Sequence, residues 1–481
     1  MSIRLSRLLL QDAQLPAGDD RVVEGVTSDS RQVKPGFVFV ALPGTKADGT
    51  AFIAQALAQG AVAIVADKKA SDIIHSTHPR RLLALMAARF YDAQPDTIVA
   101  VTGTNGKTSV SVFVRQIWEQ MGFRAASLGT IGVVGPSGAE YLSHTTPDPV
   151  KLQEMVAKLA DDKVSHLAIE ASSHGLAQFR LDGLRLTAAA FTNLTRDHLD
   201  YHATLEDYFD AKMRLFEELL PEGSSAVINA DMPEASTILQ RIEARGLRAF
   251  TVGRDGTDLC LLEATRSGLG QNLKVKTPSG LYDVSLPLVG EFQTSNALVA
   301  AGLVIAAGGE PTLALHALES LKGARGRLEL AGVSSVGASI FVDYAHTPDA
   351  LETAIAALRP YVNRKLVVLF GCGGDRDKGK RPMMGDIAER LADKIYITDD
   401  NPRTEDAAQI RREILQACPS ALEIDDRAAA ILDAVKNLQS GDVLLVAGKG
   451  HEEGQTIGNN VLPFSDHDAV AAAIRGEIYH G

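Results

Sequence analysis

The segment VAVTGTNGKTSVSVFVRQIWEQMG, residues 99–122, decides the fold class. An apolar, β-rich run leads into a glycine-containing turn, and an amphipathic pattern with helical spacing follows that turn. This order of strand, turn and helix is typical of a loop that binds phosphate through backbone N–H groups and a helix N-terminus. Gly106, Lys107 and Thr108 fit the phosphate-loop pattern, whereas Val101 stands where that pattern has its first glycine.

The loop predicts the binding of ATP together with Mg²⁺. In such loops the lysine reaches the outer phosphates, and the Ser or Thr hydroxyl holds the metal ion. An ordinary glycine turn with a solvated lysine is the alternative, which the coincidence of strand, loop and amphipathic helix disfavours. The loop by itself does not distinguish a kinase, a switch, a motor or a ligase. The predicted ATP-binding residues are Gly103, Thr104, Asn105, Gly106, Lys107, Thr108 and Ser109.

The rest of the chain alternates β-rich runs with helical patterns, which is typical of an α/β protein with largely parallel sheets. At roughly 150 residues per domain, 481 residues are expected to form about three domains. We expect a smaller α/β domain over residues 1–90 and a central domain over 91–326, whose mostly parallel sheet has helices on both faces. A Rossmann-like domain follows over 327–481, although it lacks the glycine pattern of dinucleotide binding.

One segment of the central block has a different pattern. The sequence QNLKVKTPSGLYDVSLPLVG, residues 271–290, predicts an antiparallel insert of two or three strands. Pro278, Ser279 and Gly280 mark the turn between two of these strands.

Composition and charge limit the class of function. A formal net charge of −12 argues against a general nucleic-acid or membrane-surface binder, although a local cluster of amides and cations can still hold small anions. The three cysteines are far apart, which suggests a reducing compartment and neither disulfides nor a cysteine zinc site. The longest apolar run, residues 297–307, is too short to span a membrane. We expect a cytoplasmic monomer that acts on small molecules.

Eight short motifs occur in order along the chain. They are TGTNGKTS (102–109), EASSHGL (170–176), TNLTRDHLDYH (192–202), AKMRLF (211–216), DYAHTPDAL (343–351), GCGGDRDKGKRPMM (371–384), DNPR (400–403) and GKGHE (448–452). Together they resemble the Mur ligase family over nearly the whole chain. The resemblance implies a UDP-binding N-terminal domain, a central ATPase domain and a C-terminal domain that brings an amino acid. It implies ATP-dependent addition of meso-diaminopimelate to UDP-N-acetylmuramoyl-L-alanyl-D-glutamate, in peptidoglycan precursor synthesis.

Such a ligase must activate a carboxylate, and the γ-phosphoryl group of ATP does so by forming an acyl phosphate. Metals and cations are needed because two anions meet in this step. Glu170 and His198 follow β-rich runs, so parallel strands would place both near Lys107. The resemblance implies that Thr108, Glu170 and His198 bind Mg²⁺. The alternative for Glu170 is a helix cap, and the alternative for His198 is a surface histidine. It also implies that Lys212 is carbamylated and serves a second Mg²⁺, whereas a helical lysine is usually solvated.

Further contacts follow from the resemblance alone. The adenine and ribose contacts are Asn296, Arg327 and Asp343, each of which has an equally good structural interpretation. The uridine-nucleotide contacts are Ser28, Ser30, Thr45, Lys46 and Ala47, in segments that otherwise look like polar loops. The contacts to the sugar and dipeptide are His144, Thr145, Thr146, Ser172, Gln178 and Arg180, of which His144 stands where a related enzyme has Asn.

The acceptor amino acid is indicated by DNPR, which follows the β-rich run KIYIT at the edge where α/β sheets bind ligands. Arg403 offers a forked donor to a carboxylate, worth about 1.5–3 kcal/mol. Diaminopimelate carries one more carboxylate than lysine, so a pocket with an unmatched arginine would reject lysine. A proline turn with a surface arginine is the alternative. The resemblance implies diaminopimelate contacts at Arg376, Asp400, Asn401, Pro402, Arg403, Gly448 and Glu452, the last for the distal ammonium.

Three other functions stay open on the sequence. A folylpolyglutamate synthetase shares the phosphate loop within the wider family. A P-loop switch or motor would hydrolyse ATP without an amino acid. A non-enzymatic nucleotide-binding module would bind ATP without turnover.

Overall fold

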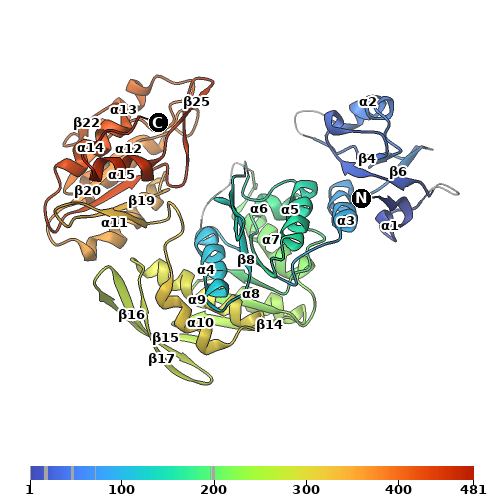
Figure 1. Cartoon of the computed structure of the whole chain (residues 1–481), viewed down its shortest axis with the longest axis horizontal. Helices are drawn as coiled ribbons and strands as arrows, with labels where there is room; N and C mark the ends of the chain where they lie inside the picture. The colour runs from blue at the N-terminus through green and yellow to red at the C-terminus, as the bar shows by residue number, and fades with distance from the viewer. Residues whose placement is uncertain are drawn as a thin grey trace. The chain divides into compact units, whose positions relative to one another are not determined.

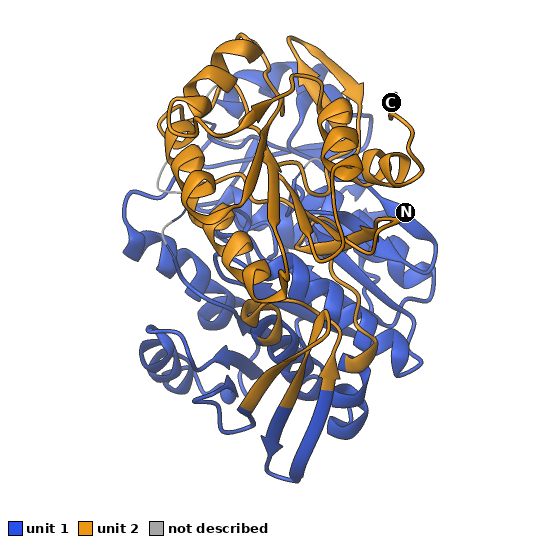
Figure 2. Cartoon of the chain, turned by 90° about the vertical axis from the view of Figure 1, so that its left-hand side faces the viewer, with its two compact units in different colours: residues 1–262, 274–284, 295–318 blue, residues 263–273, 285–294, 319–481 orange. Residues whose placement is uncertain are grey.

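The computed structural model describes residues 2–15, 20–44, 48–70, 72–142, 144–195, 197 and 201–480. Residue contacts divide the chain into two compact units, which are coloured separately in Figure 2. Unit 1 comprises residues 1–262, 274–284 and 295–318, and unit 2 comprises residues 263–273, 285–294 and 319–481. Each unit has its own buried apolar clusters.

The first part of unit 1 is built on a four-stranded parallel sheet (Figure 1). Val38 and Val40 point to one face and pack with the cluster of α1 and α3, whereas Phe39 points to the other face and packs with Ala56 of α2. This alternation follows from the two-residue period of a strand. The elements are β1 (Ile3–Arg4), α1 (Leu5–Leu9), β2 (Val22–Val23), β3 (Gly25–Thr27), β4 (Phe37–Val40), α2 (Ile53–Ala58), β5 (Ala63–Ala66), β6 (Ile73–His75) and α3 (Pro79–Tyr91).

The largest sheet has the order β10-β9-β8-β11-β7-β12-β13-β14-β15-β16-β17. The strands from β8 to β15 run parallel, and β9 and β10 add antiparallel strands at one end. Strand β7 carries the start of the fold-deciding segment and lies between β11 and β12, so the loops after these three strands meet at one edge. The bounds are β7 (Thr97–Thr102), β8 (Ala125–Gly129), β9 (Gly132–Gly135), β10 (Gly138–Glu140), β11 (His166–Glu170), β12 (Ala188–Phe191), β13 (Ser225–Asn229) and β14 (Arg248–Gly253).

Helices cover both faces of this sheet. Ile98 and Ile228 point to one face, in a buried cluster with residues of α5, α7 and α8. Val227 points to the opposite face, where a Cβ atom at Gly302 of α9 would lie 3.0 Å from its Cγ1. The predicted mostly parallel sheet with helices on both faces is therefore confirmed. The helices are α4 (Lys107–Gln120), α5 (Pro149–Asp161), α6 (Ser173–Ala177), α7 (Leu205–Arg214), α8 (Ala235–Ala244), α9 (Glu291–Ala306) and α10 (Pro311–Ala317).

The segment with the different pattern forms strands, as the sequence predicts. Strands β15 (Leu259–Ser267), β16 (Gly270–Thr277) and β17 (Gly280–Leu286) are consecutive neighbours at the end of the largest sheet. The turn between β16 and β17 falls at the predicted Pro278 and Ser279. The insert is therefore an extension of the central sheet.

Unit 2 is built on a six-stranded sheet of order β18-β19-β23-β20-β21-β22, in which only β18 is antiparallel to its neighbour. Helices α11 to α13 pack on one face, and α14 and α15 pack on the other. The predicted Rossmann-like arrangement is confirmed. The elements are β18 (Glu329–Val333), β19 (Ser339–Asp343), α11 (Pro348–Leu358), β20 (Leu366–Phe370), α12 (Lys380–Leu391), β21 (Lys394–Ile397), α13 (Ala407–Leu415), β22 (Leu422–Glu423), α14 (Arg427–Lys436), β23 (Val443–Ala447), β24 (Gly454–Ile457), β25 (Asn460–Pro463) and α15 (Asp466–Ile474).

The helices of the chain are short. Among the described residues the longest helix is α9 (Figure 1), with 16 residues. In the part of the chain that the structure describes, no helix combines the length and apolar character needed to cross a membrane.

Candidate functional site

The phosphate loop, residues 103–106, joins β7 to α4 and requires glycine at two positions. Gly103 and Gly106 have φ values of +140° and +85°, which side chains rarely adopt. A Cβ atom would lie 1.9 Å from Thr192 Oγ1 at Gly103, and 2.2 Å from Asn296 Oδ1 at Gly106. The segment after β12 holds the loop, because the Thr104 N–H donates to Asn193 O at 2.9 Å. The loop is thus rigidly supported, with Asn296 beside it.

Two lysines meet at one carbonyl group of this loop. Lys107 Nζ donates to Gly103 O at 2.9 Å and to Thr104 O at 2.6 Å. Lys212, which is buried in α7, also donates from Nζ to Gly103 O at 2.7 Å, and its ammonium lies 4.1 Å from the ring centre of Tyr208. Burial, and then repulsion by Lys107, lowers the pKa of Lys212 well below its ordinary value. Burial and the neighbouring Lys107 therefore favour the neutral form of the Lys212 amine.

Glu170 ends β11 and is fully buried next to the first residues of α4. Its carboxylate accepts hydrogen bonds from Thr108 Oγ1 at 3.2 Å, from the Thr130 N–H at 2.8 Å and from Thr130 Oγ1 at 3.0 Å. The structure thus brings the two predicted magnesium ligands Thr108 and Glu170 together. His198, the third, lies outside the described residues.

These oxygen donors fit Mg²⁺, which takes one or two protein ligands and completes its shell with phosphate oxygens and water. Among the described residues there is no group of three or more His, Cys, Asp or Glu side chains that could hold a metal ion. A protonated Lys212 does not fit a cation site, so its predicted role depends on the carbamate.

The residues predicted for the sugar and dipeptide form one network with Glu170. Thr146 Oγ1 lies 3.2 Å from Glu170 O and 3.0 Å from Ser172 Oγ. Arg180 donates to Thr146 O at 2.6 Å and to Gln178 Oε1 at 2.7 Å. Thr145 Oγ1 contacts Thr130 Oγ1 at 3.0 Å, next to the exposed His144. A substrate bound to this network would lie close to the phosphate loop.

The predicted uridine contacts belong to the smaller sheet. Ser28 and Ser30 follow the carboxyl end of β3, and Ser30 is buried. No hydrogen bond within the described parts of the chain joins either serine to the Glu170 network. Thr45, Lys46 and Ala47 lie outside the described residues.

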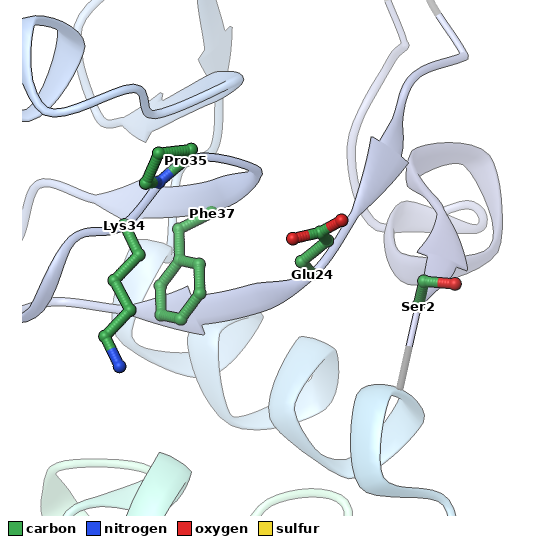
Figure 3. Close-up of a pocket in the computed structure, with 5 residues that line it drawn as sticks. All are labelled: Ser2, Glu24, Lys34, Pro35 and Phe37. Carbon is green, nitrogen blue, oxygen red and sulfur yellow. The ribbon is translucent and has the colours of Figure 1, made fainter.

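A cavity of about 740 Å³ opens at the amino edge of the same strands. Figure 3 shows Lys34 and Phe37 on one side of it and Glu24 and Ser2 on the other. Parallel sheets bind ligands at their carboxyl edge, so we assign no ligand to this cavity.

The predicted nucleotide residues divide between the two units. Asn296 lies beside the phosphate loop in unit 1, and Arg327 and Asp343 lie in unit 2. Desolvation raises the pKa of Asp343 to about 6, although Arg327 opposes the shift. The Arg327 guanidinium lies 4.8 Å from the ring centre of Tyr344, and no described residue accepts a hydrogen bond from its buried Nε.

The acceptor loop, residues 400–403, follows β21 and meets the GKGHE segment. Asn401 Nδ2 donates to Glu452 Oε2 at 2.8 Å. The buried Lys449 ammonium contacts Asn401 Oδ1 at 3.1 Å and Glu452 Oε2 at 3.2 Å. Arg403 donates from Nη1 to Gly374 O at 2.7 Å. The loop thus has a buried charged support on one side.

The other predicted acceptor residues lie around this loop. A Cβ atom at Gly448 would lie 3.4 Å from Asp400 Oδ2, and one at Gly374 would lie 1.9 Å from Pro402 O. Arg376 is exposed on the segment that follows β20. The structure therefore brings six of the seven predicted residues into one cluster and places Arg376 on the neighbouring segment.

Sequence reasoning did not single out three residues of these sites. Thr130 supports Glu170 from a segment without a motif, so no sequence signal marked it. Lys449 stands inside the GKGHE motif between two predicted contacts, where the motif could have indicated it. Tyr208 lies under Lys212, four positions earlier on α7, and helical spacing could have suggested that contact.

Comparison with known proteins adds independent findings. Residues 22–91 match the description "Mur ligase family, catalytic domain", residues 101–304 match "Mur ligase middle domain", and residues 326–450 match "Mur ligase, glutamate ligase domain". The chain is 56% identical over 465 residues to the UDP-N-acetylmuramoyl-L-alanyl-D-glutamate--2,6-diaminopimelate ligase of Mesorhizobium japonicum, covering 95% of this chain and 96% of that one. It is 52% identical to the protein of the same name from Brucella melitensis, covering 97% of each. A solved structure of a ligase with that name has a TM-score of 0.76 at 32% identity and covers 99% of each chain.

Proposed function

The chain belongs to the Mur ligase family, and we propose that it is the ligase that adds 2,6-diaminopimelate to UDP-N-acetylmuramoyl-L-alanyl-D-glutamate with consumption of ATP. The observation that carries this function is the identity of 56% with a relative of that name over almost the full length of both chains. The chain is therefore an amide-forming enzyme of peptidoglycan synthesis. Its three proposed domains, 1–90, 91–326 and 327–481, lie close to the three matched family regions.

The proposed reaction begins at the phosphate loop. The side-chain carboxylate oxygen of the substrate's D-glutamate attacks the γ-phosphorus of ATP, and ADP leaves. Backbone N–H groups of the loop, Lys107 and the α4 N-terminus hold the phosphates and offset the repulsion between the two anions. The network from Thr145 to Arg180 is proposed to hold the sugar and dipeptide close to Glu170. Ser28 and Ser30 are proposed to hold the uridine part.

Mg²⁺ is proposed at Thr108 and Glu170, whose hydroxyl and carboxylate oxygens suit it. When bound, the ion would neutralise phosphate charge. We also propose that Lys212 is carbamylated, since its lowered pKa favours the neutral amine that reacts with CO₂, forming an N–C bond and releasing one proton. The resulting anion would face Lys107. Incorporation of ¹³C-labelled CO₂ into wild-type protein but not into Lys212→Met tests this modification.

The second half of the reaction belongs to the acceptor. The amine of diaminopimelate attacks the acyl carbon, and collapse of the tetrahedral intermediate expels phosphate and leaves the amide. We propose that Arg403 pairs with the carboxylate that lysine lacks, together with Arg376. Glu452 is proposed to pair with the distal ammonium. Arg327, Asp343 and Asn296 are proposed to contact the adenosine part of ATP.

The chain is further proposed to act as a monomer in the cytoplasm. The absence of a membrane-spanning helix among the described residues and the small charged substrates are consistent with this location. Neither nucleic acid nor membrane insertion is needed for the reaction.

The experiment that tests the function measures ADP release by the whole chain with ATP and Mg²⁺. We expect release only when the UDP-muramoyl-dipeptide and diaminopimelate are both present, and much slower release with lysine. Release with folate and glutamate would favour a folylpolyglutamate synthetase instead. ATP hydrolysis without an amino acid would favour a switch or motor, and ATP binding without turnover would favour a binding module.

A further inference from the structure

The hairpin β24–β25 contacts the acceptor loop through β24. Gln455 Nε2 donates to Asp400 O at 2.8 Å, and the Thr456 N–H donates to Asn401 Oδ1 at 2.9 Å. A parallel bridge then pairs Arg403 with the end of β24. The hairpin thus contacts the loop along most of its length.

The backbone of Arg403 is held by this hairpin at both of its polar groups. Its N–H donates to Thr456 O at 3.0 Å, and its C=O accepts from the Gly458 N–H at 2.7 Å. Arg403 has φ of +51°, a left-handed conformation that is unfavourable for a residue with a long side chain. Such a conformation persists only when the surrounding structure enforces it. The two hydrogen bonds to the hairpin supply that enforcement.

The direction of the Arg403 side chain depends on this backbone conformation. From the left-handed position the guanidinium reaches across to Gly374, in the segment that follows β20. An Arg403 relaxed to an ordinary negative φ would turn its Cβ to a different side of the loop. The hairpin therefore determines the position of the Arg403 guanidinium.

We propose that the Gln455 side chain and the main chain of Thr456 position the acceptor loop for acceptor selection, an inference that rests on the proposed function. They hold the acceptor loop so that Arg403 presents its guanidinium to the second carboxylate of diaminopimelate. Neither residue needs to touch ATP or the UDP substrate for this role. Loss of these contacts will therefore weaken recognition of the acceptor selectively.

The test compares Gln455→Glu with wild type. A carboxylate oxygen in place of the amide N–H would repel Asp400 O, so the loop loses one attachment and gains a repulsion. We expect the KM for diaminopimelate to rise about 5- to 20-fold, and the preference for diaminopimelate over lysine to fall by a similar factor. The KM values for ATP and for the UDP substrate should stay within about twofold, which general damage to the fold would not allow.

Two further variants and one control complete the test. Gln455→Met removes the donor without adding charge and should show a smaller change in the same direction, which decides the outcome if Gln455→Glu does not fold. An added Cβ atom at Gly458 would have no other atom within 4 Å, but the φ of +57° is strained for alanine. Gly458→Ala should therefore also raise the KM for diaminopimelate. Val461 on β25 is 68% exposed, and Val461→Thr should behave like wild type.

The outcomes separate this inference from the proposed function. Wild-type kinetics in Gln455→Glu and Gln455→Met, or an equal rise in all three KM values, would overturn the positioning role alone. A wild-type chain that releases no ADP with all three substrates would overturn the proposed function.

Discussion

The phosphate loop, residues 103–106, and the acceptor loop, residues 400–403, both follow a strand of a parallel sheet, yet different residue types carry their left-handed backbone. In the phosphate loop these residues are Gly103 and Gly106, and added Cβ atoms there would collide with neighbours. In the acceptor loop the residue is Arg403, whose side chain the proposed chemistry requires. Glycine lets the first loop adopt its backbone conformation without strain, whereas the strained backbone of Arg403 in the second is held by the hairpin β24–β25.

This difference separates two kinds of specificity. In the proposed reaction backbone groups bind the phosphates, which requires the absence of side chains and an exact main-chain path. The proposed discrimination between diaminopimelate and lysine requires a charged side chain at a defined place, and Arg403 has an unfavourable φ there. Substitutions in the first loop should abolish the reaction, and those in the second should change its selectivity.

The largest effect is expected from Gly106→Ala, which should lower the rate of ADP release by about a thousandfold or more, because both the φ of +85° and the contact with Asn296 forbid a side chain. Gly122→Ala is the matched control, since Gly122 has φ of +86° with no atom within 4 Å of an added Cβ. It should cost about 1 kcal/mol of unfolding free energy and leave the rate unchanged. Equal rates in the two variants would refute the steric argument.

The next effect concerns the acceptor loop. Arg403→Ala should reduce the preference for diaminopimelate over lysine by about 10- to 100-fold, because one charge-assisted hydrogen-bond pair is lost. The KM for ATP should not change. Steady-state kinetics with each amino acid measure both quantities, and Arg412→Ala on the exposed face of α13 serves as control. An unchanged preference for diaminopimelate over lysine would show that Arg403 does not bind the second carboxylate.

A weaker, pH-dependent effect is expected at Glu405, which accepts hydrogen bonds from Arg381 and from the Asp375 N–H beside the acceptor loop. The hydrogen bond from Arg381, followed by that from the Asp375 N–H, lowers the pKa of Glu405 from its ordinary value of 4.5 to about 2. A lowered acid pKa stabilises the folded state above pH 4.5, and this contribution disappears as the pH falls towards 2. The free energies of unfolding of wild type and Glu405→Gln, measured with urea, should therefore converge over that pH range. A constant difference between the two free energies would contradict the assignment.

The smallest effect isolates the backbone of Arg403. Arg403→Gly and Arg403→Ala both lose the guanidinium, but glycine adopts the left-handed conformation without strain. The free energy of unfolding of the glycine variant should therefore be about 0.5–1 kcal/mol higher than that of the alanine variant. Chemical denaturation of the two proteins measures the difference, and a more stable alanine variant would show that the hairpin does not strain this residue.

The two loops also differ in how much of their structure could be predicted from the sequence. The strand, turn and helix around Lys107 and Thr108 could be predicted because they are contiguous in the chain. The α/β class and the edge position of Glu170 followed from the alternation of strands and helices. The support of Glu170 by Thr130 and the left-handed φ of Arg403 could not be predicted, because they depend on contacts 40 and more residues apart in the chain.

The proposed reaction depends on the transfer of a phosphoryl group to a carboxylate, and isotope transfer tests that step most directly. The UDP-muramoyl-dipeptide is prepared with ¹⁸O in both oxygens of the D-glutamate side-chain carboxylate, and the reaction is run with ATP and diaminopimelate. An acyl phosphate predicts one ¹⁸O atom in each phosphate released, with the other retained in the amide. Amide formation with unlabelled phosphate would contradict the account.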